Sequence, residues 1–206
     1  MINIIGLEGI PAVKHGDNIG YLIVEASKTH GIGISDGDII VVTQKIVSKS
    51  EGRVINVDEI EASEFAKELS KNSDKDPKHV EVILRESRGI VEMRKHVLIT
   101  ETKHGFICAN AGVDRSNVNE GYLVLLPEDP DESALKLMNE VNRLTGKNVA
   151  VIITDTWGRP WRLGQVDFAI GVAGMSPFKD YRGLFDPSGY ELGVTNIAVA
   201  DELASA

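Results

Sequence analysis

Apolar positions divide the first part of the chain into short alternating elements. Residues 3–5 (NII) form a brief apolar run that predicts a strand, and residues 17–29 place apolar side chains on one face of a helix. The run DIIVVT at 38–43 has no alternation, which predicts a buried strand. Strands and helices at this spacing indicate an α/β or α+β protein.

The middle of the chain is charged, and its pattern predicts helices followed by strands. Helices are expected at 62–73 and 77–87, and the second begins with Asp76 as N-cap and Pro77 at its first position. The next pieces are rich in β-formers, and their short connections predict antiparallel pairing. These pieces are 89–93, 96–101 and 106–110, with a further strand at 122–126.

The clearest periodic pattern lies in the last third of the chain. Residues 130–144 predict a helix that Asp129 caps, with Glu132 completing a capping box and Gly146 ending the helix. The segment NVAVIITDT at 148–156 is apolar without alternation, as expected of a central strand covered on both sides. The pattern predicts an α+β fold class, with mixed sheets and helices in a single domain over residues 1–206.

Composition and charge exclude several classes of protein. The 206 residues are 42% hydrophobic, which suits a globular domain with a core. The formal charge of −9 argues against nucleic acid as a partner, so an anionic ligand would need metal ions or a local basic cluster. There is no run of about 18 apolar residues and no signal-peptide pattern, so we expect no membrane association and a cytoplasmic protein. The single cysteine, Cys108, is expected to be a buried strand thiol.

The stretch ITDTWGRPWRLGQ at 153–165 concentrates polar and aromatic side chains at the end of the predicted central strand. Asp155 between two threonines offers hard oxygens that suit Mg²⁺ or Mn²⁺, although an aspartate there could equally cap a turn. The next residues predict a stiff loop for a planar or anionic substrate, or else tryptophans that pack and arginines that pair with acids. The residues concerned are Trp157, Arg159, Trp161 and Arg162.

Two further segments follow predicted strands. ANAGVDRSN at 109–117 places Asp114 where it could share a metal with Asp155, although the same residue types also form Asx turns. VVTQKIVSKSEGR at 41–53 carries basic residues at four-residue intervals that would line one helical face, for phosphates or simply for solvent. These are Lys45, Lys49 and Arg53. The chain has neither GxxxxGK[ST] nor GxGxxG.

Taken together, a series of motifs resembles the coenzyme F420-0:L-glutamate ligase family across nearly the whole chain. In order they are GLEGIP, VVTQKIVSKSEGR, NAGVDRSNV, LLPEDPDESA, GKNVAVIITDTWGRPWRLGQVDFAIGVAG and VTNIAVADELA. The resemblance implies a GTP-dependent ligase that adds L-glutamate to the carboxylate of coenzyme F420-0, and then a second, γ-linked glutamate. It also implies an intertwined homodimer and an acyl-phosphate intermediate with no protein nucleophile.

The same resemblance assigns ligands to numbered positions. A divalent metal, Mg²⁺ or Mn²⁺, is implied at Asp114, Asp155 and Thr156, with K⁺ as a candidate additional ion. The implied contacts to GTP fall on Ile10, Pro11, Ala12, Val13, Thr43, Gln44, Lys49 and Asn117. Our own hypothesis is that Arg159 and Arg162 hold the phosphodiester or carboxylate of the precursor, with Trp157 or Trp161 beside its ring.

One departure from the family pattern concerns the end of the sequence. The helix that begins near Ala198 leads, in the family, into a Gly-rich stretch with a further metal ligand, and that stretch is not in these 206 residues. Two other interpretations stay open, the first because of this departure and the second because no residue identifies the pocket for the amine. One is a truncated, non-catalytic module for nucleotide binding or dimerisation, and the other is a related ligase that uses a different amino acid.

Overall fold

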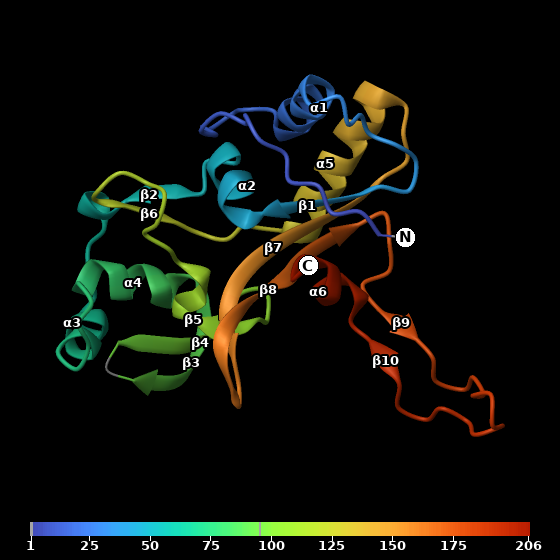
Figure 1. The fold of residues 1–206 in the computed structure, drawn as a ribbon. Helices are drawn as coiled ribbons and strands as arrows, with labels where there is room; N and C mark the ends of the chain where they lie inside the picture. The colour runs from blue at the N-terminus through green and yellow to red at the C-terminus, as the bar shows by residue number, and fades with distance from the viewer. Residues whose placement is uncertain (1, 95) are drawn as a thin grey trace.

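The computed structural model describes residues 2–94 and 96–206 and shows an α+β fold (Figure 1). Its helices are α1 Ile19–Thr29, α2 Gln44–Ser50, α3 Glu64–Ser70, α4 Pro77–Arg85, α5 Pro130–Thr145 and α6 Val199–Ala204, with short 3₁₀ helices η1 Val57–Glu59 and η2 Asn110–Gly112. Its strands are β1 Ile39–Thr43, β2 Val54–Asn56, β3 Ser87–Arg94, β4 Val97–Thr102, β5 Ile107–Ala109, β6 Tyr122–Val124, β7 Ala150–Arg159, β8 Arg162–Ala173, β9 Lys179–Asp180 and β10 Asn196–Ile197. The described residues contain no helix that is long and apolar enough to cross a membrane.

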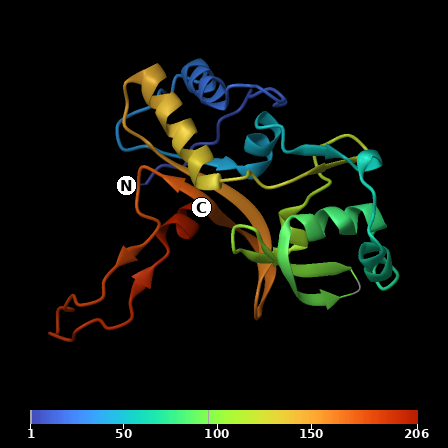
Figure 2. The ribbon, with the colours of Figure 1, turned by 180° about the vertical axis from the view of Figure 1, so that it is seen from behind.

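The main sheet has the strand order β1-β7-β8, so β7 is its central strand, as the sequence predicts. Strand β7 runs parallel to β1, with Val42 opposite Ile153, and antiparallel to β8. Helices α1 and α5 cover one face of the sheet and α6 covers the other (Figures 1 and 2). Ile153 therefore packs under α1 and α5, whereas Ile152 packs against Ala200 of α6. Burial on both faces explains why this segment has no polar alternation.

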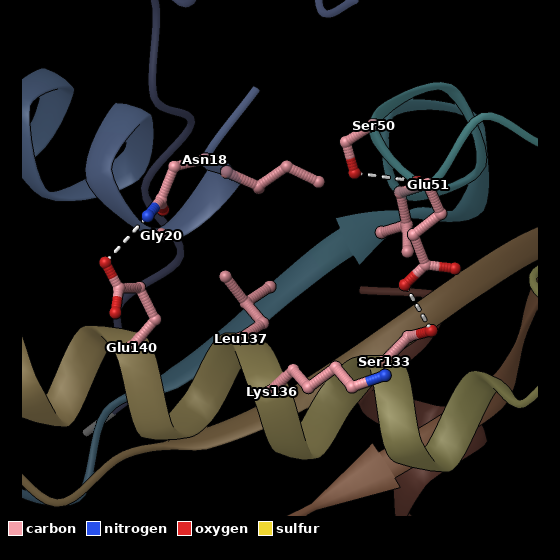
Figure 3. Close-up of a pocket in the computed structure, with 10 residues that line it drawn as sticks. Asn18, Gly20, Ser50, Glu51, Ser133, Lys136, Leu137 and Glu140 are labelled. Atoms are coloured by element: carbon pink, nitrogen blue, oxygen red, sulfur yellow. Dashed lines mark hydrogen bonds between the residues drawn. The ribbon is translucent and has the colours of Figure 1, made fainter. Parts of the chain in front are cut away.

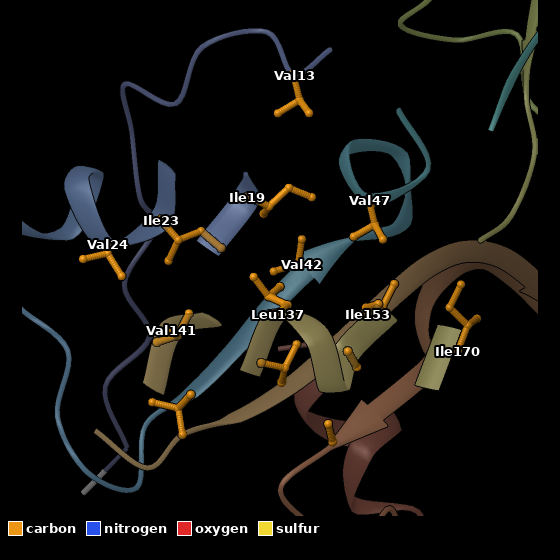
Figure 4. Packing of buried hydrophobic residues seen from close by; sticks show 14 of the residues in the cluster. Val13, Ile19, Ile23, Val24, Val42, Val47, Leu137, Val141, Ile153 and Ile170 are labelled. Atoms are coloured by element: carbon orange, nitrogen blue, oxygen red, sulfur yellow. The ribbon is translucent and has the colours of Figure 1, made fainter. Parts of the chain in front are cut away.

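The core between the main sheet and α1 and α5 consists of aliphatic side chains (Figure 4). Helix α5 contributes Leu137 and Val141 to it, and helix α1 contributes Ile23 and Val24. These residues recur at the spacing of a helix face, which is the signal that predicts both helices from sequence. Burial of such side chains contributes roughly 1.5–3 kcal/mol each.

Capping residues fix where the helices begin and end. Asp129 accepts a hydrogen bond from Glu132 N at 2.9 Å, and Gly146 ends α5 in the left-handed conformation, so both predictions are confirmed. The side chain of Glu132 does not follow the predicted capping box, since it pairs with Lys136 at 3.6 Å. Asp76 caps α4 through Lys78 N, as predicted.

A second region has its own sheets and apolar cluster. Strands β3, β4 and β5 form an antiparallel sheet in that order, which confirms the predicted pairing, and β2 pairs with β6. Helices α3 and α4 lie beside them, and Val80 and Ile83 of α4 are completely buried there. Cys108 on β5 is buried, and burial raises the pKa of its thiol to about 12, so it is a structural residue.

Three predictions are corrected by the structure. Residues 3–5 form no strand and pair with no described strand. The segment after Asp155 is not a loop, because β7 continues to Arg159 and turns back into β8. Arg53 lies beyond the end of α2 and bonds Glu86 at 2.8 Å, so it does not share a helical face with Lys45 and Lys49.

Candidate functional site

The site lies at the carboxyl ends of β1 and β7. The parallel register places Thr43 beside Thr154, so the residues that follow each strand emerge side by side. On β1 the chain turns directly into α2 at Gln44, and on β7 the next residue is Asp155. Gln44 and Ser48 of α2 are completely buried, and Ser48 Oγ donates to Gln44 Oε1 at 2.9 Å. The Gln44 Nε2 donor is buried and has no hydrogen-bond partner among the described residues.

Asp155 is the most electrostatically perturbed carboxylate of the site. Burial raises its pKa to about 6, and the neighbouring charge of Asp114 acts in the same direction. An ionised carboxylate in a buried position lowers the stability of the folded protein unless a cation binds to it. A perturbed pKa of this kind is typical of a functional residue. Asp155 does not cap a turn, since β7 continues past it to Arg159.

Asp114 faces the same region from the loop before β6. Backbone bonds between Asp114 and Val124, at 3.0 and 2.8 Å, hold this loop on the sheet edge. The carboxylate accepts hydrogen bonds from Ser116 N at 2.9 Å and Ser116 Oγ at 2.7 Å, and Lys45 Nζ lies 2.8 Å from it. Burial alone would raise the pKa of Asp114, but the bonds from Lys45 and Ser116 lower it to about 2.

These donors fit a hard divalent cation of the Mg²⁺ type. Such ions are bound by one or two carboxylates, with water and substrate phosphates filling the other positions. In the described part of the chain no group of three or more His, Cys, Asp or Glu side chains could form a complete metal cage. Asp114 and Asp155 therefore suit a metal that arrives with a phosphate ligand, and they do not suit a permanent structural ion.

Thr156 does not join this pair through its side chain. Successive residues of a strand point to opposite faces, and Asp155 is partly buried whereas Thr156 is exposed. The Thr156 hydroxyl donates to Asp167 of β8. Thr156 and Asp167 thus form a separate oxygen pair on the other face of the hairpin, next to Ser205, whose hydroxyl donates to the carbonyl oxygen of Asp167 at 2.7 Å.

A pocket of about 460 Å³ adjoins the Asp114 loop, and it collects four of the residues expected to contact a nucleotide. Those four are Ala12, Val13, Lys49 and Asn117. Lys49 Nζ donates to the carbonyl oxygen of Asn117, which joins α2 to the loop. His15 and Tyr122 also line this pocket, and sequence reasoning missed both. They offer ring surfaces that could hold a flat base.

The remaining expected nucleotide contacts lie elsewhere. Ile10 and Thr43 line a different pocket along β1, which has a volume of about 420 Å³. Pro11 is exposed and precedes Ala12, and Gln44 is completely buried at the start of α2. The structure therefore gathers part of the expected set at one pocket and distributes the rest along the adjoining end of β1.

The hairpin between β7 and β8 carries the four residues assigned to the precursor. Trp157 stacks on Phe168, with ring centroids 5.0 Å apart, and its partly buried side chain packs on the main core. Trp161, in contrast, is fully exposed at the tip with φ 60°. Arg159 and Arg162 form no ion pair with the rest of the described chain. Arg159 is partly buried, and its Nη1 donates to the carbonyl oxygen of Gly164 at 3.4 Å, whereas Arg162 and the indole of Trp161 are exposed.

Another hollow lies between α1, α2 and α5 (Figure 3), with a volume of about 250 Å³. Glu51 accepts a hydrogen bond from Ser133 Oγ at 2.6 Å, and Glu140 accepts one from Asn18 Nδ2 at 2.7 Å. None of the expected site residues lines this hollow. Its polar groups serve the packing of the three helices against one another.

The raised pKa of Asp155 predicts a stability change in the metal-free protein. Because the pKa is higher in the folded state than its ordinary value of 3.8, the folded protein loses stability as pH rises from about 4 to about 6. Asp155→Asn should therefore be about 1–3 kcal/mol more stable than the wild type at pH 8, and the difference should vanish near pH 4. Urea unfolding in EDTA at both pH values measures it. A variant less stable than the wild type at pH 8 would contradict this reading.

Comparison with known proteins identifies a family model and relatives that match this chain. The family model described as F420-0:Gamma-glutamyl ligase matches residues 9–206. A protein named coenzyme F420:L-glutamate ligase from Methanothermobacter thermautotrophicus is 49% identical over 205 residues, covering 100% of this chain and 81% of that relative. A protein of the same name from Methanocaldococcus jannaschii is 50% identical, covering 99% of this chain and 80% of that relative. Another from Methanopyrus kandleri is 47% identical, covering 94% of this chain and 75% of that relative.

Proposed function

The chain belongs to the F420-0:Gamma-glutamyl ligase family, and from this premise we propose that it is a GTP-dependent ligase that joins L-glutamate to the carboxylate of coenzyme F420-0. The observation that carries the proposal is the arrangement at the start of α2. Lys45 pairs with Asp114, the adjoining strand ends place Thr43 beside Thr154, which precedes Asp155, and the next turn of α2 carries Lys49, which lines a pocket with Asn117. Two carboxylates next to lysines suit a metal–nucleotide complex and would repel a lone anion.

The nucleotide is placed in the pocket beside α2. Lys45 and Lys49 lie one turn apart on this helix, and both reach the 114–117 loop. A triphosphate between them would have its charge offset by both ammonium groups and would extend toward Asp114. The resemblance supplies guanine as the base, and the ring surfaces of His15 and Tyr122 could accept it.

In the proposed reaction, a carboxylate oxygen of F420-0 attacks the γ-phosphorus of GTP, and the bond to the GDP oxygen breaks. The acyl phosphate that forms is attacked by the amine of glutamate, phosphate leaves with the C–O electron pair, and the amine loses a proton. The protein supplies positioning and charge and needs no nucleophile of its own. When bound at Asp114 and Asp155, Mg²⁺ or Mn²⁺ would neutralise charge on the phosphate oxygens.

An isotope experiment tests this mechanism. F420-0 labelled with ¹⁸O in its carboxylate should transfer one labelled oxygen to inorganic phosphate when the first glutamate is added. A second, γ-linked addition activates the unlabelled γ-carboxylate of the first glutamate and should release unlabelled phosphate. Product carrying one glutamate together with only unlabelled phosphate would exclude the acyl phosphate. The same samples show by mass whether one glutamate or a second, γ-linked one is added.

The guanidinium groups of Arg159 and Arg162 on the β7–β8 hairpin are proposed to bind the phosphodiester or carboxylate of the precursor, since arginine binds such groups through a planar fork. We expect Arg162→Ala to raise the KM for F420-0 by roughly tenfold with little change in the KM for GTP. Steady-state kinetics with each substrate varied in turn measures this. An unchanged KM for F420-0 would show that the hairpin serves another purpose.

We further propose that the protein works as an intertwined homodimer. An arm of residues 176–197, which contains β9 and β10, projects from the body (Figures 1 and 2), and its side chains include exposed Phe185, Tyr190 and Val194. Apolar residues on such an extended arm are typical of segments that pack on a second copy. Sedimentation equilibrium of the wild type and of Val194→Asp provides the test, and a monomeric wild type would exclude the dimer.

A further inference from the structure

Lys45, placed beside the triphosphate in the proposed chemistry, also pairs with one of the proposed metal ligands. It is the second residue of α2, and its ammonium nitrogen lies 2.8 Å from Asp114 Oδ2. The two side chains are 29% and 34% exposed, so the pair is partly shielded from water. Lys45 also acts electrostatically on Asp155, because that carboxylate lies on the neighbouring strand end. One lysine thus pairs with Asp114 and lies close in the chain to Thr43, which is beside Thr154, the residue before Asp155.

The oxygen atoms of Asp114 are already engaged. Oδ1 accepts a hydrogen bond from Ser116 N, and Oδ2 accepts one from Ser116 Oγ in addition to the pair with Lys45. The Ser116 bonds lie within the loop and fix the direction of the carboxylate. Among the contacts of the carboxylate with the described residues, the pair with Lys45 is the one that reaches another element, and it uses the oxygen surface that a cation would need.

A second lysine of α2, one helical turn further on, also contacts the 114–117 loop. Lys49 Nζ donates to the carbonyl oxygen of Asn117, so two lysines of α2 hold the two ends of the 114–117 loop. The chain itself therefore supplies positive charge beside Asp114. This charge offsets the repulsion between the two carboxylates.

We propose that Lys45 is a resident counter-ion of the metal site, which a divalent cation has to displace from Asp114 before the site is complete. The displaced ammonium then binds phosphate oxygens of the nucleotide that arrives with the metal. The inference rests on the proposed function for the identity of the metal–nucleotide complex. The consequence is that metal binding and nucleotide binding are coupled. Metal that binds alone must break the Lys45–Asp114 pair, whereas metal that binds with a nucleotide gives Lys45 a new anionic partner.

A purely structural role for Lys45 predicts the opposite behaviour. If the pair with Asp114 only held the loop in place, loss of the ammonium would loosen the loop and weaken every ligand. If Lys45 competes with the metal, loss of the ammonium strengthens metal binding to the free protein. The sign of the change in metal affinity therefore separates the two roles.

The test is direct binding of Mn²⁺ to the nucleotide-free protein, measured from the free Mn²⁺ signal by electron paramagnetic resonance. We expect Lys45→Met, which keeps the length of the side chain without its charge, to bind Mn²⁺ roughly threefold to tenfold more tightly than the wild type. Addition of GDP should tighten Mn²⁺ binding less in this variant than in the wild type. Lys45→Arg retains the charge and should keep the weaker wild-type affinity.

Two controls fix the interpretation. Lys28→Met removes a lysine that is also 2.8 Å from its acidic partner, Glu25, but lies on α1, and its Mn²⁺ affinity should equal that of the wild type. Asp114→Asn should bind Mn²⁺ more weakly than every other variant. Weaker or unchanged Mn²⁺ binding in Lys45→Met would overturn the inference while leaving the metal site intact. Absence of Mn²⁺ binding from the wild type and Lys45→Met alike, with or without GDP, would overturn the metal site itself.

Discussion

Asp155→Asn is expected to abolish glutamate ligation while leaving the protein folded. The amide keeps the size of the side chain but removes its charge, so one of the two carboxylates that converge at the end of β7 is lost. Because the proposed catalysis consists of charge neutralisation and positioning, we expect turnover to fall by roughly a thousandfold or more. Mass spectrometry of F420-0 samples after incubation with GTP, L-glutamate and Mn²⁺ measures the loss.

A matched substitution shows whether the loss is specific. Asp58→Asn changes an aspartate on η1, outside the site, and should retain wild-type turnover. Circular dichroism and urea unfolding establish that both variants are folded. Turnover of Asp155→Asn within tenfold of the wild type would contradict the role assigned to this carboxylate.

Gly171→Ala is expected to have the largest effect on stability. A Cβ atom at this position would lie 2.2 Å from the carbonyl oxygen of Pro130 and 2.4 Å from its carbonyl carbon. Pro130 begins α5, and the next residue, Asp131, accepts a hydrogen bond from Val172 N at 2.8 Å. The start of the helix is thus docked directly on the backbone of β8. Relief of the clash requires movement of backbone, so we expect a loss of about 3 kcal/mol or more.

Gly158→Ala is the control for this substitution. Gly158 lies on the adjoining strand β7, and a Cβ atom there would meet nothing within 4 Å. Its stability should stay within about 0.5 kcal/mol of the wild type, as is usual for a surface substitution. Urea unfolding of the three proteins under identical conditions provides the comparison. Equal midpoints for Gly171→Ala and the wild type would show that α5 can shift on the sheet at little cost.

Local signals predict the main elements of the fold well. Helix α5 is found where Asp129, Pro130 and Gly146 place it, because an N-cap, a proline at the first position and a left-handed glycine act on neighbouring backbone. The central strand is also predicted, because burial on both faces leaves a direct mark in NVAVIITDT.

Structure that depends on distant partners is predicted less well. Residues 3–5 have the composition of a strand but find no described strand to pair with. The hairpin beyond Asp155 is missed because Gly158 and Pro160 are typical of loops, whereas its strands are held by cross-strand pairing and by the stacking of Trp157 on Phe168. Such contacts join residues on separate strands, which a short sequence window does not register.

The same distinction applies to the site. Sequence motifs single out Asp114 and Asp155 individually, and the structure brings both near Lys45. The role of Lys45 could not be read from its own segment, since its partner lies far along the chain and a lysine on a helix is most often solvated. The separation of Thr156 from Asp155 likewise follows from strand geometry, which places adjacent side chains on opposite faces.

The central claim is that the 206-residue chain itself ligates glutamate to F420-0 at the Asp114–Asp155 site with GTP. The most direct measurement is a mass-spectrometric assay of the purified chain with F420-0, L-glutamate, Mn²⁺ and either GTP or ATP. We expect product heavier by one or more glutamate units with GTP, much less with ATP, and none after removal of Mn²⁺ by EDTA. Folded protein that binds Mn²⁺ and GDP but forms no product would contradict the claim.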